Sequence, residues 1–170
     1  MSVREIRDAI ENMTQVLSEE PEKALSTGAA TATLESGLRF RLSGQNSSMA
    51  FTDMPISLGG QGSAAKPGWF LRASLASCNA TVIAMRAAQL DIELKTLEVT
   101  VISNADTRGL LGSDDSVSAG LFDWRTQVRI GADEASPEQL REIVTWAEAH
   151  SPVSCSIRDV KSTEVEIEIV

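Results

Sequence analysis

The sequence predicts an α+β fold, because helical and strand-like patterns occur in separate blocks along the chain. The segments 3–17 and 67–90 repeat apolar residues at helical spacing, whereas 38–42 and 161–170 alternate with period two. The length of 170 residues is typical of one domain, and 42% hydrophobic with 23% charged residues is ordinary for a globular protein. We therefore expect a single domain with three helices and six strands.

The first expected element is a helix with a defined start. Ser2 and Glu5 form a capping-box pattern, and apolar residues then continue at helical spacing to Leu17. We expect residues 1–27 to form this helix and a linker with at most a short helical turn. Residues 28–170 then form the rest of the single domain.

Three strands are expected between this linker and the central helix. The segments 30–34 and 38–42 pair as a hairpin around a turn at Ser36-Gly37. A third strand covers 49–58 and is bent or ended near Pro55. The side chains expected on the inner face of the hairpin are Leu38, Phe40 and Leu42.

A long helix from about Pro67 to Leu90 is the expected centre of the fold. Its alanine-rich faces allow close approach by other elements, so we expect it to be buried on most sides. The loop at Gly59–Gly62 before it lacks the pattern of a phosphate-binding loop, and we interpret it as a flexible connection. One seam of the helix carries Leu71, Leu75, Cys78, Val82, Met85 and Gln89.

The second half of the chain predicts two strands, a helix and a last strand. The strands cover 97–102 and 121–130, with a loop at 108–120 between them. Ser136 is the expected N-cap of the helix, with Pro137 at its first position. The adjacent acids Asp114 and Asp115 in the loop are interpreted as solvated side chains rather than a catalytic pair. The sixth strand is expected over Lys161–Val170.

Composition excludes several functions. A net charge of −9 argues against binding nucleic acid or an anionic membrane surface, and the sequence contains no stretch that could span a bilayer. Two cysteines without a recognisable export signal indicate a reducing compartment, so we expect a cytoplasmic protein. With two Cys and one His, neither a metal site nor a bound cofactor is expected.

The two cysteines lie in contrasting settings. Cys78 ends Leu75-Ala-Ser-Cys78 within the central helix, and Cys155 follows the segment Glu148-Ala-His-Ser-Pro-Val-Ser154. Together with Gly59-Gly-Gln-Gly62 and Pro67, these sequence segments and their order along the chain resemble the OsmC/Ohr family of thiol peroxidases. The resemblance extends from about residue 28 to the end of the chain and is to a divergent branch of that family.

This resemblance implies an OsmC-like fold and an activity. The implied fold is a mostly antiparallel six-stranded sheet wrapped around a long central helix in an intertwined homodimer, with thiol sites at the subunit interface. The implied activity is the reduction of organic hydroperoxides in the response to oxidative stress. The implied partners are a second copy of the chain, a small hydroperoxide and an external thiol or dithiol reductant.

Cys78 matches the family's peroxide-attacking cysteine, and two other family positions are changed. Gly68 stands where the family has a glutamate, and Ser151 stands where it has a resolving cysteine. The activating arginine is matched only loosely, by Arg39 with Arg41 in reserve. An ordinary cysteine with a pKa near about 8.5 is only slightly ionised at neutral pH, so such a cation is needed.

Two questions stay open at this point. If Ser151 to Cys155 forms a helical turn, Cys155 can approach Cys78 and act as a resolving thiol; if the segment is extended, it cannot. Cys78 is either a nucleophile or an inert core thiol, which is a common role of buried cysteines. The alternative function is a non-catalytic dimer that binds a small apolar ligand or acts as a scaffold. His150 is expected to be only a cation near a helix end.

Overall fold

The computed structural model of the protein describes residues 1–159 and 162–170. Within them lie three short 3-10 turns, Pro21–Ala24, Gln45–Ser47 and Ile56–Leu58. The helices are α1 (Val3–Glu19), α2 (Pro67–Gln89), α3 (Thr107–Leu111), α4 (Pro137–His150) and α5 (Pro152–Arg158). The strands are β1 (Ala30–Ser36), β2 (Arg39–Gly44), β3 (Met49–Thr52), β4 (Leu94–Asn104) and β5 (Phe122–Ala132).

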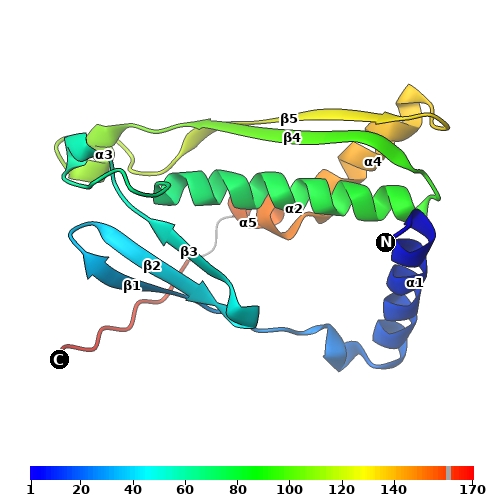
Figure 1. The fold of residues 1–170 in the computed structure, drawn as a ribbon, viewed down its shortest axis with the longest axis horizontal. Coiled ribbons are helices and arrows are strands. Elements are labelled where there is room, and N and C mark those ends of the chain that lie inside the picture. Colours follow the sequence, from blue (N-terminus) through cyan, green and yellow to red (C-terminus); the bar gives the residue numbers. More distant parts are fainter. Residues whose placement is uncertain (160–161) are drawn as a thin grey trace.

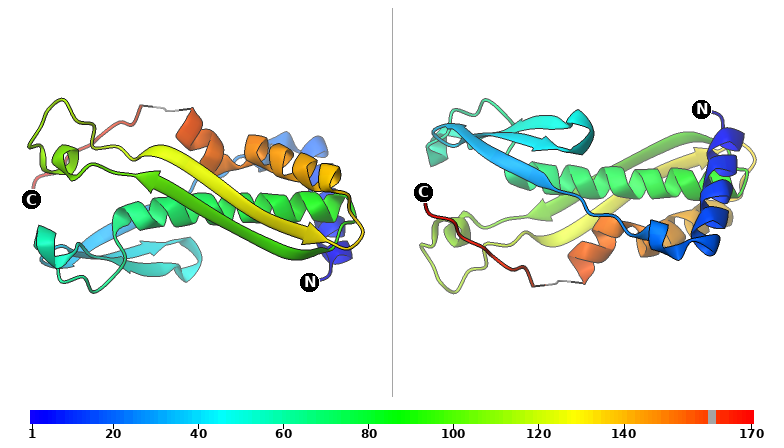
Figure 2. Two further views of the ribbon diagram at one scale, coloured as in Figure 1. Left: turned by 90° about the horizontal axis from the view of Figure 1, so that it is seen from above. Right: turned by 90° about the horizontal axis from the view of Figure 1, so that it is seen from below.

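Helix α2 is the axis of the molecule, and the other elements are arranged along it (Figure 1). The antiparallel pair β4–β5 runs along one side of α2 and crosses it obliquely when seen from above (Figure 2). The antiparallel sheet β1-β2-β3 lies on the other side, near the start of α2. Helices α4 and α5 lie beside α2, and α1 lies at its C-terminal end.

The core lies where α2, α4 and the β4–β5 pair meet. Ile143 and Ala147 of α4 are fully buried, and Ile83 and Ala87 of α2 are 1% exposed. The small side chain of Ala87 lets α4 approach α2 closely, so the isoleucines fill the space between the helices. This core holds the middle and the C-terminal half of α2 in a fixed position.

Several predicted element starts are confirmed. Ser2 caps α1 and Ser136 caps α4, each in a complete capping box, and α2 covers nearly the predicted range. The third strand ends at Thr52, shortly before Pro55. The sequence did not predict helix α3, which begins just before the loop expected at 108–120. Asp106 is the N-cap of this helix.

The prediction of a sixth strand is wrong for the part that the structure describes. Residues 162–170 have no regular secondary structure, and the first residue of the predicted strand, Lys161, lies outside the described residues. Val165, Ile167 and Ile169 are 79%, 80% and 91% exposed. Alternation favours a strand only when a neighbouring strand pairs with it, and this segment has none among the described residues of the single chain. Five strands in two small sheets therefore replace the single six-stranded sheet.

The hairpin also differs from its prediction. All of β1 is exposed, and Leu38 is 39% exposed instead of facing inward, while Phe40 and Leu42 are half-buried. The reason is that neither face of the β1-β2-β3 sheet is covered by a helix in the described part of the single chain (Figure 1). No helix within the described residues is both long enough and apolar enough to cross a membrane.

Candidate functional site

The candidate site is built around Cys78, which is half-buried in the middle of α2. The Ser151 hydroxyl donates a hydrogen bond to the Cys78 sulfur, with 3.2 Å between Oγ and Sγ. Ser151 is fully buried and Cys78 is half-buried, so the contact is shielded from solvent on the serine side. The structure thus brings together the cysteine on α2 and the serine that the sequence resemblance matched with a resolving cysteine.

A second hydrogen bond ties the same two segments together. The Ser154 hydroxyl donates to Oδ1 of Asn79 over 2.8 Å, and Asn79 is 4% exposed. Neighbouring residues of α2, Cys78 and Asn79, are therefore each bonded to a serine of the turn that begins α5. Sequence reasoning missed this link, although an asparagine on a helix otherwise rich in alanine is a signal that could have shown it.

Local sequence explains why Ser151 points at the sulfur. Its backbone is extended (φ −75°, ψ 116°), so α4 ends there, and Pro152 occupies the first position of α5. Ser151 is the N-cap of α5, and its Oγ accepts a hydrogen bond from the Ser154 backbone N–H over 3.4 Å. Residues 152–155 are therefore helical, and the Cys155 N–H donates to the Ser151 carbonyl over 2.9 Å, so Ser151 to Cys155 spans one helical turn rather than an extended segment.

Cys155 lies in α5, and its sulfur has partners other than Cys78. It contacts the backbone oxygen of Ala149 at 3.4 Å, and the Arg158 guanidinium donates to it over 3.2 Å. Both cysteines are free thiols. The cation of this region thus lies beside the second cysteine, an arrangement that sequence spacing at 155 and 158 could have indicated.

The two candidate activating arginines are held within the β1-β2-β3 sheet. Arg39 donates to Glu35 over 3.1 Å and to the Ser63 hydroxyl over 2.7 Å, and its guanidinium stacks 4.4 Å above the ring of Phe51. Arg41 lies 3.8 Å from Glu35. Among the described residues of the single chain, neither arginine forms a hydrogen bond or ion pair with a cysteine.

Arg39 is linked through Ser63 to a buried carboxylate, Asp53, which is 1% exposed. Asp53 accepts hydrogen bonds from the backbone of Ser63, from the Ser63 hydroxyl, and from the backbone of Met54 and Gln61. The backbone N–H of Ser63 is the largest cause that lowers the pKa of Asp53 below its usual value. This carboxylate fixes the connection from β3 to α2, so the loop is not the flexible one that the sequence indicated.

Gly68, which the sequence resemblance matched with a glutamate, is next to another arginine. The guanidinium of Arg72 donates to the Gly68 carbonyl over 3.0 Å, and to the hydroxyl and carbonyl oxygens of Ser103 over 2.9 and 3.1 Å. Arg72 therefore joins the first turns of α2 to β4. A Cβ at position 68 would lie at ordinary contact distance, 3.6 Å, from the Arg72 guanidinium.

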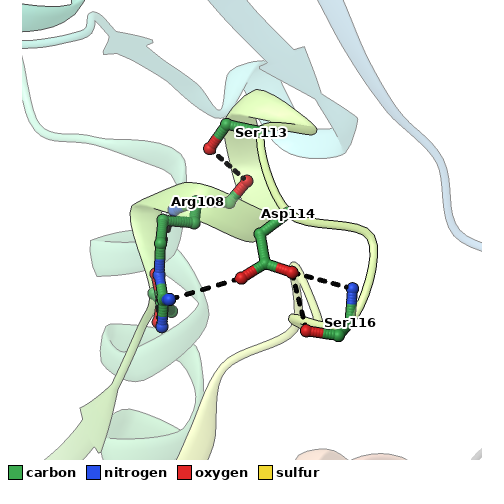
Figure 3. Close-up of polar contacts among 5 residues, drawn as sticks. Arg108, Ser113, Asp114 and Ser116 are labelled. Atoms are coloured by element: carbon green, nitrogen blue, oxygen red, sulfur yellow. Dashed lines mark hydrogen bonds and ion pairs between the residues drawn. The ribbon is translucent and has the colours of Figure 1, made fainter.

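Of the two adjacent acids, Asp114 holds the α3 loop together through contacts with Arg108 and Ser116 (Figure 3). Asp114 accepts hydrogen bonds from the Ser116 hydroxyl and backbone and lies 3.3 Å from the Arg108 guanidinium. The hydroxyl of Ser116 is the main cause that lowers the pKa of Asp114. Arg108 also pairs with Asp106, the N-cap of α3. Asp115 is exposed, as expected for a solvated side chain.

His150 takes part in a stack at the end of α4. Its ring lies parallel to that of Trp146 with centroids 3.9 Å apart, and the Arg86 guanidinium lies 4.7 Å from the Trp146 ring. The stack joins α4 to the last turns of α2. Within the described residues, no three His, Cys, Asp or Glu side chains are grouped so that they could hold a metal ion.

A cavity of about 510 Å³ lies next to the Asn79–Ser154 bond. It is bounded by α2, β5, α4 and α5, and Glu148 and Arg158 are its charged lining residues. Its lining is otherwise largely apolar, which suits a small ligand. The apolar lining residues are Leu75, Ile83, Trp124, Val128, Val144 and Ile157.

Comparison with known proteins shows the family. The model of the OsmC-like protein family matches residues 60–168, which include Cys78, Ser151 and Cys155. The chain belongs to the OsmC-like family. No protein with a curated description matches the sequence.

Solved structures of OsmC and Ohr proteins have the same fold. An OsmC-like protein from Mycoplasma pneumoniae has 17% identity and a TM-score of 0.65, with 79% of this chain and 89% of that chain covered. The organic hydroperoxide resistance protein OsmC from Legionella pneumophila has 21% identity and a TM-score of 0.57, covering 79% and 90%. OhrB of Bacillus subtilis has 19% identity and a TM-score of 0.52, covering 79% and 93%. At these sequence identities, the similarity shows that the chain shares the fold of these proteins and shows nothing further.

Proposed function

We propose that this OsmC-like protein reduces organic hydroperoxides, with Cys78 as the nucleophile. The observation that carries the proposal is the hydrogen bond from the buried Ser151 hydroxyl to the half-buried Cys78 sulfur. An inert core thiol needs no polar partner, whereas a hydroxyl that donates to sulfur favours the thiolate, which is the reactive form. Several of the similar structures are named organic hydroperoxide resistance proteins, which agrees with this substrate class.

The proposed reaction balances with an external thiol as reductant. The Cys78 thiolate attacks the hydroxyl-bearing oxygen of the peroxide, so that an S–O bond forms, the O–O bond breaks, and the leaving alkoxide takes a proton to become the alcohol. The sulfur has then given up two electrons and is a sulfenic acid. A thiol attacks it to form a mixed disulfide and water, and a second thiol exchanges with that disulfide and releases Cys78.

The source of the first thiol is an external molecule in this proposal, with Cys155 as the internal alternative. Ser151 cannot form a disulfide. The Cys155 thiol is hydrogen-bonded to the backbone oxygen of Ala149 and to the guanidinium of Arg158. Helical geometry places Cys155 one turn after Ser151, so its approach to Cys78 requires it to leave those two partners.

We also propose that the active form is a homodimer. The single chain exposes 12336 Å², about one and a half times the roughly 8,100 Å² expected for a compact chain of this mass. The exposed surface includes the whole of β1 and the apolar side chains of residues 165–170. A second copy of the chain can cover both, and it can bring the sheet that carries Arg39 to a Cys78 that this sheet does not contact in the single chain.

Peroxide consumption tests the proposed activity directly. With tert-butyl hydroperoxide and dithiothreitol, we expect turnover by the wild type, loss of turnover in Cys78→Ser, and turnover largely retained in Cys155→Ser. Loss in Cys155→Ser as well, together with a Cys78–Cys155 disulfide in non-reducing mass analysis, would make Cys155 the resolving thiol. No turnover, with Cys78 unmodified by the peroxide, would contradict the proposal.

The 510 Å³ cavity favours the alternative of a ligand-binding dimer without catalysis. Because Trp124 lines the cavity, binding of a small apolar molecule there changes its fluorescence. Saturable quenching by decanoate that disappears in Trp124→Phe, in a protein without peroxidase turnover, would support this alternative.

The proposed location is the cytoplasm, where thiols such as Cys78 and Cys155 stay reduced.

A further inference from the structure

We propose that Ser151 is a positioning residue for Cys78, whose hydroxyl holds the sulfur in its attacking position and stabilises the thiolate. This inference rests on the proposed function and assigns a role to the residue that stands where the family has a second cysteine. It is carried by the 3.2 Å contact between Ser151 Oγ and Cys78 Sγ and by the complete burial of the serine.

The cap of α5 is compatible with donation from the Ser151 hydroxyl to the sulfur. A hydroxyl has one proton to donate and two lone pairs with which to accept. Ser151 Oγ uses one lone pair to accept from the Ser154 backbone N–H, and its proton remains available for the Cys78 sulfur. The same cap therefore fixes the position of the serine and leaves its proton available to the sulfur.

Burial makes this single bond effective. A hydrogen bond to a charged acceptor is about twice as strong as one between neutral groups, and the complete burial of Ser151 keeps water from competing for its hydroxyl. A neutral thiol accepts weakly, whereas a thiolate accepts strongly, so the bond favours the ionised sulfur. The hydroxyl of Ser154 cannot take over this role, because it already donates to Asn79.

The same contact determines the fate of the sulfur after oxidation. A sulfenic acid formed at Cys78 lies against a hydroxyl that can donate to its oxygen but cannot form an S–S bond. The oxidised sulfur is therefore kept at this site until a thiol attacks it. Because a serine stands at position 151, the sulfenic acid at Cys78 is not converted to a disulfide with that position and persists. A reagent such as dimedone can then trap it.

Two variants separate the hydroxyl from its capping role. Ser151→Ala loses the hydroxyl and is a poor N-cap, whereas Ser151→Gly loses the hydroxyl and remains an acceptable N-cap. Ser136→Ala is the matched control, because it removes the cap of α4, a serine whose bonds are to Gln139 and not to a cysteine. All three are made in a Cys155→Ser background, so that only Cys78 reacts.

The measurement is the rate of alkylation of Cys78 by iodoacetamide across pH. We expect the pH midpoint of alkylation to rise by about one unit in both Ser151→Ala and Ser151→Gly, and to stay unchanged in Ser136→Ala. Ser151→Thr, which keeps a hydroxyl, should restore the midpoint. After one equivalent of peroxide, dimedone should label the serine protein more completely than either Ser151 variant.

Three outcomes would overturn the inference. These are an unchanged midpoint in both Ser151 variants, a rise in Ser151→Ala alone, and an equal rise in Ser136→Ala. The alkylation readout needs no peroxide, so it is independent of turnover. A raised midpoint in a protein that does not consume peroxide would leave the role of Ser151 standing and refute only the proposed function.

Discussion

At the scale of single residues, two serines and one buried carboxylate position the site. Ser151 and Ser154 bond adjacent residues of α2, and Asp53 fixes the loop from which α2 starts. The sequence identified Cys78 and Ser151 as individual positions, but not the bond between them, because 73 residues separate the pair. Contacts at such separation depend on how α2 and α4 pack, which spacing along the chain does not encode.

The Ser151–Cys78 contact predicts that a cysteine introduced at position 151 forms a disulfide. In Ser151→Cys, with Cys155→Ser to remove competition, the two sulfur atoms lie close enough to bond because Oγ and Sγ are 3.2 Å apart in the wild type. We expect one equivalent of peroxide to produce a disulfide between Cys78 and the introduced cysteine, detected as a loss of both free thiols. Ser156→Cys, on the exposed side of α5, is the control and should keep its free thiol.

Asp53 predicts a pH-dependent contribution to stability. Its pKa is lowered in the folded state, so the stabilisation is present above the usual value of 3.8 and is lost as pH falls through the lower folded-state pKa. At pH 7 we expect Asp53→Asn to lower Tm by several degrees, and at pH 2 the difference from the wild type should narrow. Asp115→Asn removes the same charge from an exposed position and should change Tm little at either pH. A constant difference for Asp53→Asn at both pH values would contradict this account.

At the scale of elements, helix starts were predictable and helix α5 was not. Ser2 and Ser136 lie in capping boxes whose partners are three residues away, so the local sequence contains the whole signal. The Ser151-Pro152 pair repeats the Ser136-Pro137 pair, yet the sequence left its conformation open because Pro152 disfavours a helical residue before it. The structure reconciles both facts, since Ser151 is extended and the helix begins at Pro152.

The packing of α4 on α2 predicts the effect of a small core change. Ile143 is fully buried between these helices, so Ile143→Val should destabilise the protein by about 1 kcal/mol by leaving a methyl-sized space. Urea unfolding followed by circular dichroism measures this change. The same substitution at Ile56, which is 79% exposed, should be close to neutral. Equal losses of unfolding free energy at both positions would show that burial in the single chain does not determine the destabilisation.

At the scale of the whole molecule, the two sheets and the C-terminal segment are what the sequence could not place. The alternation of residues 161–170 predicted a strand, but a strand needs a neighbour to pair with, and the described single chain offers none to it. The same holds for the inward face of the hairpin, which has no helix against it in the described residues. Both differences concern surfaces for which we propose a second copy of the chain as the partner.

The proposed dimer predicts that the apolar side of the C-terminal segment is needed for association. A triple variant of Val165, Ile167 and Ile169 to Ser should weaken the dimer at least about tenfold, because it removes apolar surface that the partner would cover. Sedimentation equilibrium measures the change. The matched control replaces Glu164, Glu166 and Glu168, the alternate residues of the same segment, with Ser. A monomeric wild type, or equal weakening by both triple variants, would refute the proposed contact.

The exposed C-terminal segment also has a consequence for a newly made chain before it meets another. Val165-Glu-Ile-Glu-Ile-Val170 is a short β-prone stretch with open backbone groups, the kind of segment that stacks into cross-β aggregates. The glutamates between its apolar residues act as gatekeepers, since identical chains stacked in register would align their negative charges. The glutamates that oppose aggregation of newly synthesised chains thus alternate with the apolar residues of the segment. The apolar side chains remain available for the second copy of the chain in the proposed dimer.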